Sequence, residues 1–328
     1  VGLNYFRSNT DNLLTRQSLG FLSGLDMNWS NGGKLKNDGF DVSFTAKLLA
    51  LKDWQWQVGA SAGHYKNKIT ELPEGRTYVD NDIYGATIRT QVGNVANAFY
   101  GYKTLGVFAS TEEAQAAGLP GEQGLYFMAD NGVDKNYFQA GDVHFADLNG
   151  DGQISEADKT VIGNPNPDVY GNIFATINWK HLTLSAVFNY SLGNDVFNYY
   201  RSVLEGGKNF YNQTVAMTNR WRADGQETNM PRAVYDDPMG NSRFSDRWIE
   251  DGSYLRLKTL NLTYKIPSGL TWLQGLSIWA EATNLFTISR YTGGDPEFSV
   301  SDNVLYQGID AGNVAQGRIF TLGMRVNL

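Results

Sequence analysis

Residues 54–63 read Trp-Gln-Trp-Gln-Val-Gly-Ala-Ser-Ala-Gly, and residues 182–191 read Leu-Thr-Leu-Ser-Ala-Val-Phe-Asn-Tyr-Ser. In both stretches apolar residues recur at every second position, with mostly polar or small residues between them. Because successive side chains of a strand point to opposite faces, this pattern predicts strands with one apolar and one polar face. Residues 41–48 and 320–328 repeat the alternation. The pattern alone fits a soluble β-sandwich as well as a barrel whose apolar face meets lipid.

The lengths of the connections favour the barrel. The sequence predicts ten strands, at 1–14, 34–51, 54–70, 84–94, 98–108, 169–180, 181–196, 253–266, 273–290 and 317–328. Short connections at 52–53, 94–97, 180–181 and 267–272 alternate with long ones, as periplasmic turns alternate with extracellular loops in bacterial barrels. An even number of strands places both ends of the chain at the periplasmic side. We therefore expect an all-β fold, an antiparallel transmembrane β-barrel in the outer membrane.

One predicted strand departs from the alternation. In residues 254–266 the apolar residues of the second half share a face with Arg256 and Lys258. Either this strand extends above the membrane, or a β-bulge shifts its register.

Composition excludes several classes of protein. The 328 residues include no cysteine, so there is neither a disulfide framework nor a thiolate metal site. A net charge of -7 without any basic run argues against nucleic-acid binding. No apolar stretch is long enough for a membrane-spanning helix, and the mean hydropathy is -0.37. The segment that begins at Val1 opens inside an alternating stretch and is no signal peptide, so we expect further sequence before it.

The clearest local motif lies between residues 147 and 158. It matches the calcium-loop pattern D-x-N-x-D-G-x-I-x-x-x-D, in which a hard cation collects six or more oxygen ligands from one tight turn. The predicted metal ligands are Asp147, Asn149, Asp151, Gln153 through its carbonyl, and Asp158. Ser155 would contribute directly or through a water molecule, and the closing Asp158 reaches less far than the usual Glu. The alternative is a metal-free turn, in which the Asp and Asn side chains form hydrogen bonds with the backbone of the same turn. We expect a structural Ca²⁺ rather than a catalytic one.

Two long segments are expected to be extracellular loops. Residues 109–168 contain the calcium-type motif, and residues 197–252 are rich in aromatic residues. Those aromatic residues suit sugar stacking, a partner protein or simple loop packing. They are Phe197, Tyr199, Tyr200, Phe210, Tyr211, Trp221, Tyr235, Phe244 and Trp248. Charged residues of the same region would form inter-loop ion pairs or line a polar vestibule, namely Arg220, Arg222, Arg243, Asp246, Arg247 and Asp251.

The sequence shows no sign of an enzyme. His64, His144 and His181 lack metal-ligand spacing, and neither a nucleophile motif nor a phosphate-binding loop stands in a convincing context. We predict no catalytic residues and no cofactor-binding residues.

Several motifs together resemble the SusC/RagA family of TonB-dependent outer-membrane transporters. They are Ala98-Phe-Tyr-Gly-Tyr-Lys103 followed by Gly106-Val-Phe108, Gly141-Asp-Val143 leading into the 147–158 motif, Val161-Ile-Gly-Asn-Pro-Asn-Pro167, the 244–258 stretch, and Ala282-Thr-Asn-Leu-Phe286. The likeness runs from about residue 37 to the end, in the family's order.

The resemblance implies that residues 1–328 are the C-terminal portion of a 22-stranded barrel. It implies that an N-terminal plug and TonB box, absent from this chain, couple import to TonB. It further implies a SusD-like surface lipoprotein partner and a ligand that is an oligosaccharide or a peptide. On that interpretation polar side chains such as Lys47, Gln55, Gln57, Asn189, Glu281 and Arg325 face the channel. The alternatives are a structural barrel subunit of a larger outer-membrane assembly, a self-contained ten-stranded hydrolase, and a soluble calcium-stabilised sandwich.

Overall fold

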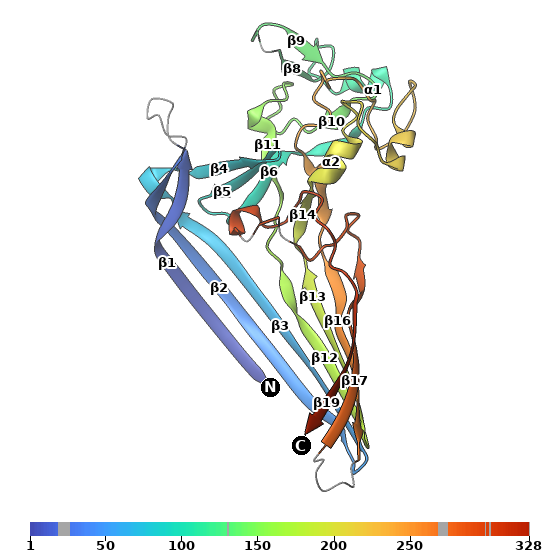
Figure 1. The fold of residues 1–328 in the computed structure, drawn as a ribbon. Coiled ribbons are helices and arrows are strands. Elements are labelled where there is room, and N and C mark those ends of the chain that lie inside the picture. Colours follow the sequence, from blue (N-terminus) through green and yellow to red (C-terminus); the bar gives the residue numbers. More distant parts are fainter. Residues whose placement is uncertain (19–26, 130, 268–274, 299, 302, 328) are drawn as a thin grey trace.

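A large antiparallel sheet forms one end of the molecule, and loops with small sheets and short helices form the other (Figure 1). The computed structural model describes residues 1–18, 27–129, 131–267, 275–298, 300–301 and 303–327. The large sheet has eight strands in the order β1 (Gly2–Ser18), β2 (Met27–Ala50), β3 (Trp54–Glu71), β12 (Val169–Trp179), β13 (Leu182–Leu192), β16 (Tyr254–Ile266), β17 (Gly275–Ser289) and β19 (Ile319–Asn327).

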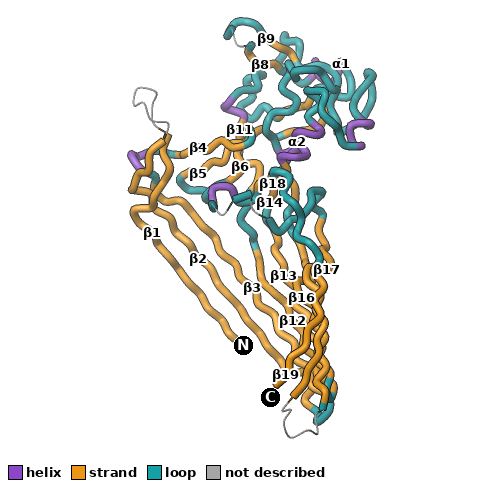
Figure 2. Tube along the Cα trace, viewed as in Figure 1, coloured by secondary structure: helices purple, strands orange, loops and turns teal. Residues whose placement is uncertain are grey.

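The loop assembly consists of the segments that lie beyond this sheet, coloured mainly as loops in Figure 2. Its strands are β4 (Tyr78–Ile83), β5 (Ala86–Gln91), β6 (Ala98–Tyr102), β7 (Thr104–Val107), β8 (Tyr126–Met128), β9 (Lys135–Tyr137), β10 (Val143–Phe145), β11 (Lys159–Gly163), β14 (Asp195–Asn198), β15 (Ile249–Asp251) and β18 (Ile309–Asp310). Its helices are α1 (Thr111–Ala116), α2 (Tyr199–Glu205) and the 3-10 turns η2 (Pro73–Gly75), η3 (Glu156–Asp158), η4 (Val215–Asn219), η5 (Asp246–Trp248) and η6 (Val304–Tyr306). No helix in the described part of the chain is long and apolar enough to cross a membrane.

Two of the ten predicted strands do not belong to the large sheet, which corrects the strand count to eight. Segments 84–94 and 98–108 form β5, β6 and β7, and β5 and β6 pair within a separate sheet of order β11-β6-β5-β4. Alternation reveals two unlike faces, but it does not reveal the partner of a strand. The apolar face of β5 and β6 is buried in the loop assembly, where Ile88 and Phe99 are almost completely inaccessible.

The alternation of short and long connections survives this correction. Residues 51–53 and 180–181 make short turns, whereas residues 72–168, 193–253 and 290–318 make long connections. Of the predicted 267–272 turn, residues 268–272 lie outside the described residues. Both ends of the chain lie toward the end of the sheet opposite the loop assembly (Figure 1).

Strand register divides the sheet into two chemically distinct faces. One row of directly paired residues crosses seven strands as Lys47, Gln57, Thr176, Ser185, Asn261, Glu281 and Thr321. The neighbouring row on the opposite face reads Ala46, Val58, Ala175, Ala186, Leu260, Ala282 and Phe320. Both rows run without a break from β2 to β19, so one face of these seven strands is mainly polar and the other is largely apolar.

A β-bulge explains the strand that departs from the alternation. The register of β16 against β13 shifts between Leu257 and Thr259, so Lys258 is the extra residue. The neighbouring strand β17 is also irregular at this point. Between the pairs Leu257–Phe286 and Thr259–Thr283 it has two residues where β16 has one, and one of the two, Asn284, has a φ of 53°. The second alternative offered by the sequence, a bulge that shifts the register, is thus confirmed.

Glycine makes room for aromatic rings that fold across neighbouring strands. A Cβ atom on Gly63 would lie 2.8 Å from Cζ of Tyr170, its direct partner on β12. A Cβ atom on Gly59 would clash with the Phe174 ring, which is paired to it in the same way. These strand glycines therefore serve close packing, as in other sheets where an aromatic ring covers a cross-strand glycine.

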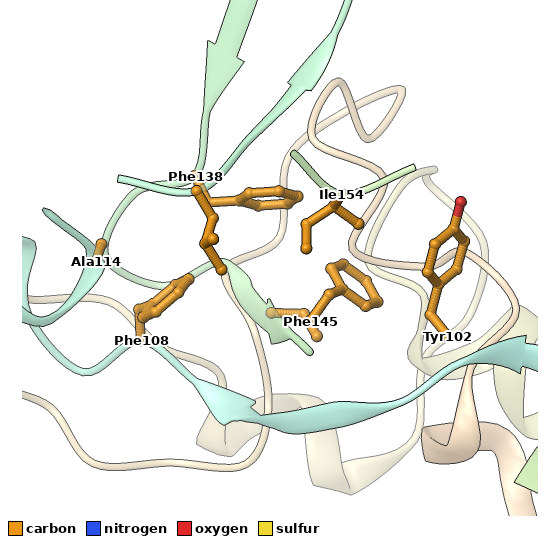
Figure 3. Close-up of a cluster of buried hydrophobic side chains, with 8 residues drawn as sticks. Tyr102, Phe108, Ala114, Phe138, Phe145 and Ile154 are labelled. Carbon is orange, nitrogen blue, oxygen red and sulfur yellow. The ribbon is translucent and has the colours of Figure 1, made fainter. Parts of the chain in front are cut away.

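The apolar cores lie in the loop assembly. One cluster, shown in part in Figure 3, contains Tyr102, Phe108, Ala114, Leu125, Phe138, Val143, Phe145 and Ile154. A second contains Ala86, Ile88, Phe99, Phe197, Trp248 and Ile309. The first cluster lies within the 72–168 connection, whereas the second takes residues from all three long connections and so packs them together.

Candidate functional site

The side chains expected to face a channel do share one face of the sheet. Lys47 pairs with Gln57, and Gln55 pairs with Asn178. The amide of Asn261 donates a hydrogen bond of 3.0 Å to Glu281. Asn189 pairs with Arg256 and Arg325 pairs with Ser277, also on the polar face.

Two adjoining hollows lie on this polar face. The larger is lined by strands of the large sheet alone, and the smaller lies where the sheet meets the loop assembly. The larger has a volume of about 680 Å³, the smaller about 490 Å³, and they share Ser191 and Tyr254. Hydroxyl, carboxamide and aromatic side chains dominate the lining. In the larger these include Asn4, Ser43, Ser61, Tyr170, Asn172, Asn189 and Tyr190, and in the smaller Asn194, Phe298, Gln307 and Gln316. A continuous surface of this kind offers hydrogen bonds and ring faces to a polar solute.

An ion network at the bulge fixes the wall of the smaller hollow. Arg256, almost inaccessible, pairs with Asp295, and its Nη1 lies 2.9 Å from Oε2 of Glu297. The bulged Lys258 donates to Gln316 at 2.9 Å and lies 3.3 Å from Oε2 of Glu297. The network therefore joins the 290–318 connection to β16. The sequence alone did not indicate Asp295, Glu297 and Gln316. The available signal was that Arg256 and Lys258 do not fit the alternation of the residues that follow them.

A buried carboxylate joins two long connections. Asp142 is fully inaccessible, and it accepts hydrogen bonds from Nε and Nη2 of Arg232 at 2.8 and 2.9 Å. The Asn241 amide donates to it at 2.8 Å. Such a charge is stable in the interior only when it is paired and fully hydrogen-bonded. This contact between residues 142 and 232–241 was also not anticipated, because sequence spacing carries no information about it.

The aromatic residues of the 197–252 segment divide between packing and exposure. Phe197 and Trp248 are buried in the second cluster, and the Trp221 indole donates to the Ala109 carbonyl at 2.9 Å. Phe210 and Tyr235 stack with their ring centroids 5.1 Å apart and are both strongly exposed. Loop packing thus accounts for the buried rings, whereas Phe210 and Tyr235 are accessible to a ligand or a partner.

The predicted inter-loop ion pairs of Arg243 and Arg247 are absent among the described residues. Burial, together with the nearby Arg201, lowers the pKa of Arg247 to about 10. Arg201 itself pairs with Glu205 and Glu250, both at 2.9 Å. Burial alone would raise the pKa of Glu250, but hydrogen bonds from Thr292 and Arg201 outweigh it and hold that pKa below its ordinary value.

The 147–158 loop has the turn geometry that its sequence predicts. Asp147 accepts hydrogen bonds from the amides of Gly150 and Gly152, both at 2.7 Å, and Gly152 has a φ of 79°. Asn149 accepts from the Asp151 amide at 3.0 Å, and Asp151 accepts from the Gln153 amide at 2.8 Å.

The closing residue Asp158 is fully inaccessible and returns to the start of the loop. It accepts from the Leu148 amide at 2.9 Å and from the Ser155 amide at 2.7 Å. Ile154 of the same loop is buried in the first cluster and anchors the loop there. Even so, no group of three or more His, Cys, Asp or Glu side chains in the described part of the chain converges as a metal site.

The three histidines remain separate. The His64 ring nitrogen Nδ1 lies 2.5 Å from the Asp168 carbonyl, and His144 stacks on Phe108. Burial lowers the pKa of His144. His181 packs edge-on against Tyr264 at the far end of the sheet.

Curated relatives cover this chain almost completely. TonB-dependent receptor P3 of Formosa agariphila is 29% identical over 339 residues, which are 99% of this chain and 32% of that protein. TonB-dependent receptor SusC of Bacteroides thetaiotaomicron is 27% identical over 340 residues, 98% of this chain and 29% of that protein. The chain thus spans about a third of the length of the relatives it matches. No family model matches the chain.

A solved structure of the RagAB peptide transporter has a TM-score of 0.76 at 23% identity, with 99% of this chain and 33% of that chain covered. The resemblance to the SusC/RagA family of TonB-dependent outer-membrane transporters is confirmed. The sheet is therefore part of an antiparallel transmembrane β-barrel, and the SusC-like chain belongs in the outer membrane. Its apolar face meets lipid, so its polar face lines the interior. The named relatives are receptors and transporters, in agreement with the prediction that the chain is not an enzyme.

Proposed function

We propose that this SusC-like chain supplies wall and vestibule to a TonB-dependent importer of oligosaccharides or peptides. The observation that carries the proposal is the unbroken polar row across seven strands, which leads up to the two hollows that share Ser191 and Tyr254. A solute entering between the loops would meet hydroxyl, carboxamide and tyrosine groups before it reached the polar channel. A SusD-like surface lipoprotein is the proposed partner, which would bind the outer ends of the loops. Energy would come from TonB through a part of the receptor outside this chain.

Uptake by the native bacterium tests this proposal. We expect deletion of the gene to abolish uptake of either a fluorescent oligosaccharide pool or a fluorescent peptide pool. In the full-length receptor, Tyr254→Ala should reduce that uptake several-fold, because it removes the only aromatic ring that lines both hollows. Tyr5→Ala is the matched control, since Tyr5 is strongly exposed and lies outside both hollows. Normal uptake of both pools in the deletion strain would disprove the proposal.

We further propose that the 147–158 loop binds Ca²⁺ as a structural ion. The support is its left-handed Gly152, the folding of Asp147 around two backbone amides, and the buried closing Asp158. Asp147, Asn149, Asp151 and Asp158 would supply side-chain oxygens, and Gln153 its carbonyl. The ion would hold the loop closed against the first apolar cluster.

Removal of calcium tests this second proposal. We expect EGTA to lower the melting temperature of the loop assembly, and added Ca²⁺, but not equimolar Mg²⁺, to restore it. Asp151→Asn keeps the shape of the side chain but removes a charge, so it should weaken Ca²⁺ binding about tenfold or more. If side-chain-to-backbone hydrogen bonds alone hold the loop, the melting temperature will be the same with and without EGTA. That result would rule the ion out.

A further inference from the structure

The short turns of the sheet form a rim with its own chemistry. This rim comprises residues 51–53, residues 180–181 and the aromatic residues Trp54, Trp179 and Tyr264. The Lys180 amide donates to the Asp53 carbonyl at 2.9 Å, so the two turns are adjacent. The Lys265 amide donates to the His181 carbonyl at 2.8 Å, which joins the end of β16 to the same edge.

Aromatic rings mark the rim as the level of the lipid headgroups. Trp54 and Trp179 are cross-strand partners on the apolar face, and they stack with ring centroids 5.5 Å apart. Both indoles are exposed, as is Tyr264 on the same face. In membrane barrels such rings form girdles at the boundary between hydrocarbon and headgroups. The stacked pair therefore has the character of such a girdle.

Two rim residues extend their polar groups over this girdle. Lys180 Nζ lies 6.0 Å from the Trp179 ring centroid. The His181 ring lies edge-on to Tyr264 at 6.5 Å. Lysine at such a level keeps its alkyl chain on apolar surface and its ammonium group among the headgroups.

The charge of the rim is opposite to that of the chain. The two turns contain Lys52 and Lys180 against a single carboxylate, Asp53, whereas the whole chain carries -7. Neither lysine forms an ion pair with any described residue. Both are exposed. Two cations without an ion-pair partner beside an aromatic girdle are suited to an anion at that depth.

We propose that Lys52 and Lys180 bind the phosphate of a membrane phospholipid, whose acyl chains lie along the exposed apolar residues Leu51, Trp54 and Trp179. Two observations favour a lipid over free phosphate. The cations are continuous with the lipid-facing surface, and paired exposed lysines hold a small ion weakly in water. The site depends on the outer-membrane location and is independent of the transported solute. It would anchor this edge of the barrel at a fixed depth.

Titration of the delipidated full-length receptor with short-chain phospholipid tests the site. Three probes are compared, namely a short-chain phosphatidylglycerol, the corresponding diacylglycerol without phosphate, and inorganic phosphate. Quenching of tryptophan fluorescence by a lipid with a bromine-labelled chain reports binding next to Trp54 and Trp179. The variants are Lys52→Gln with Lys180→Gln, Lys180→Gln alone, and Lys47→Gln as the matched control on the polar face.

We expect saturable binding of phosphatidylglycerol to the unmodified receptor and to Lys47→Gln. The double variant should bind about thirtyfold more weakly and Lys180→Gln about fivefold, which corresponds to about 1 kcal/mol for each lysine. Diacylglycerol and inorganic phosphate should each bind much more weakly than the phospholipid. Equal affinity in the double variant, or inorganic phosphate that displaces the lipid at equal concentration, would overturn the proposal.

Discussion

The membrane wall, which is the eight-stranded sheet, exposes its apolar side chains, whereas the loop assembly buries them. On β19 of the wall, Phe320, Leu322 and Met324 are 72%, 77% and 66% exposed. In the loop assembly, Phe99, Val143 and Phe145 are each 0% exposed. Both sets stand on strands with period-two alternation. The loop assembly folds as a water-soluble protein does, with its apolar faces inward, whereas the wall turns them toward lipid.

This difference shows that the two regions gain stability in different ways. The wall is held by the hydrogen-bond ladders of eight strands and by lipid contact, since no second layer covers its apolar face in the described structure. The loop assembly relies on two packed clusters and on buried charges such as Asp142. A cavity should therefore damage the loop assembly most, and a misplaced charge should damage the wall most.

The largest expected effect is the loss of a core ring in the loop assembly. Phe99→Ala should destabilise it by about 3–5 kcal/mol, because the packed surroundings cannot collapse into the space. Phe320→Ala is the matched control on the wall, where lipid fills the space and only the transfer energy of the ring, about 1.5–3 kcal/mol, is lost. Native-state hydrogen exchange should show faster exchange in β6 and β14 for Phe99→Ala only. Equal exchange rates of the β6 and β14 amides in the two variants would contradict the expected difference between the loop assembly and the wall.

A charge placed on neighbouring residues of one strand tests the two faces directly. Ala186 lies in the apolar row and Ser185 in the polar row. Ala186→Arg should destabilise the folded barrel by about 2–4 kcal/mol if it lies near the bilayer midplane. Ser185→Arg should change its stability by well under half of that. Urea titration of the full-length receptor in liposomes measures both, and a larger loss in Ser185→Arg would reverse the assignment of the faces.

The smallest expected effect is a pH dependence confined to the loop assembly. Burial lowers the pKa of His144 from the ordinary 6.5, so the unfolded state binds more protons just below that pH. The contribution of His144 to stability is therefore complete above about pH 6.5 and decreases as the pH falls below it. Melting curves between pH 8 and 5 should show this loss, and His144→Phe should reduce it. An unchanged pH profile in the variant would assign the effect to other groups.

Much of the wall could be predicted because each strand contains the necessary information locally. Eight predicted strands join the sheet, and the misfit of Arg256 and Lys258 pointed to the bulge at that point. Segments 84–94 and 98–108 were assigned to the wall incorrectly, because their alternation is the same whether the apolar face meets lipid or a protein core. The side-chain-to-backbone hydrogen bonds of the 147–158 turn are those of the alternative to a Ca²⁺ site that the sequence offered, since the positions of its Asp, Asn and Gly residues determine a local fold.

The sequence by itself determined an amphipathic β protein with its long connections at one end, because side-chain periodicity and connection length are local properties of the chain. Tertiary structure alone decided which strands pair, how Asp142 meets Arg232, and that Asp295 and Glu297 fold back onto β16. It alone brought Ser191 and Tyr254 to the lining shared by both hollows and stacked Trp54 on Trp179. The physical reason is that a buried charge or a shared cavity depends on partners many residues away, whose approach leaves no periodic trace in the sequence.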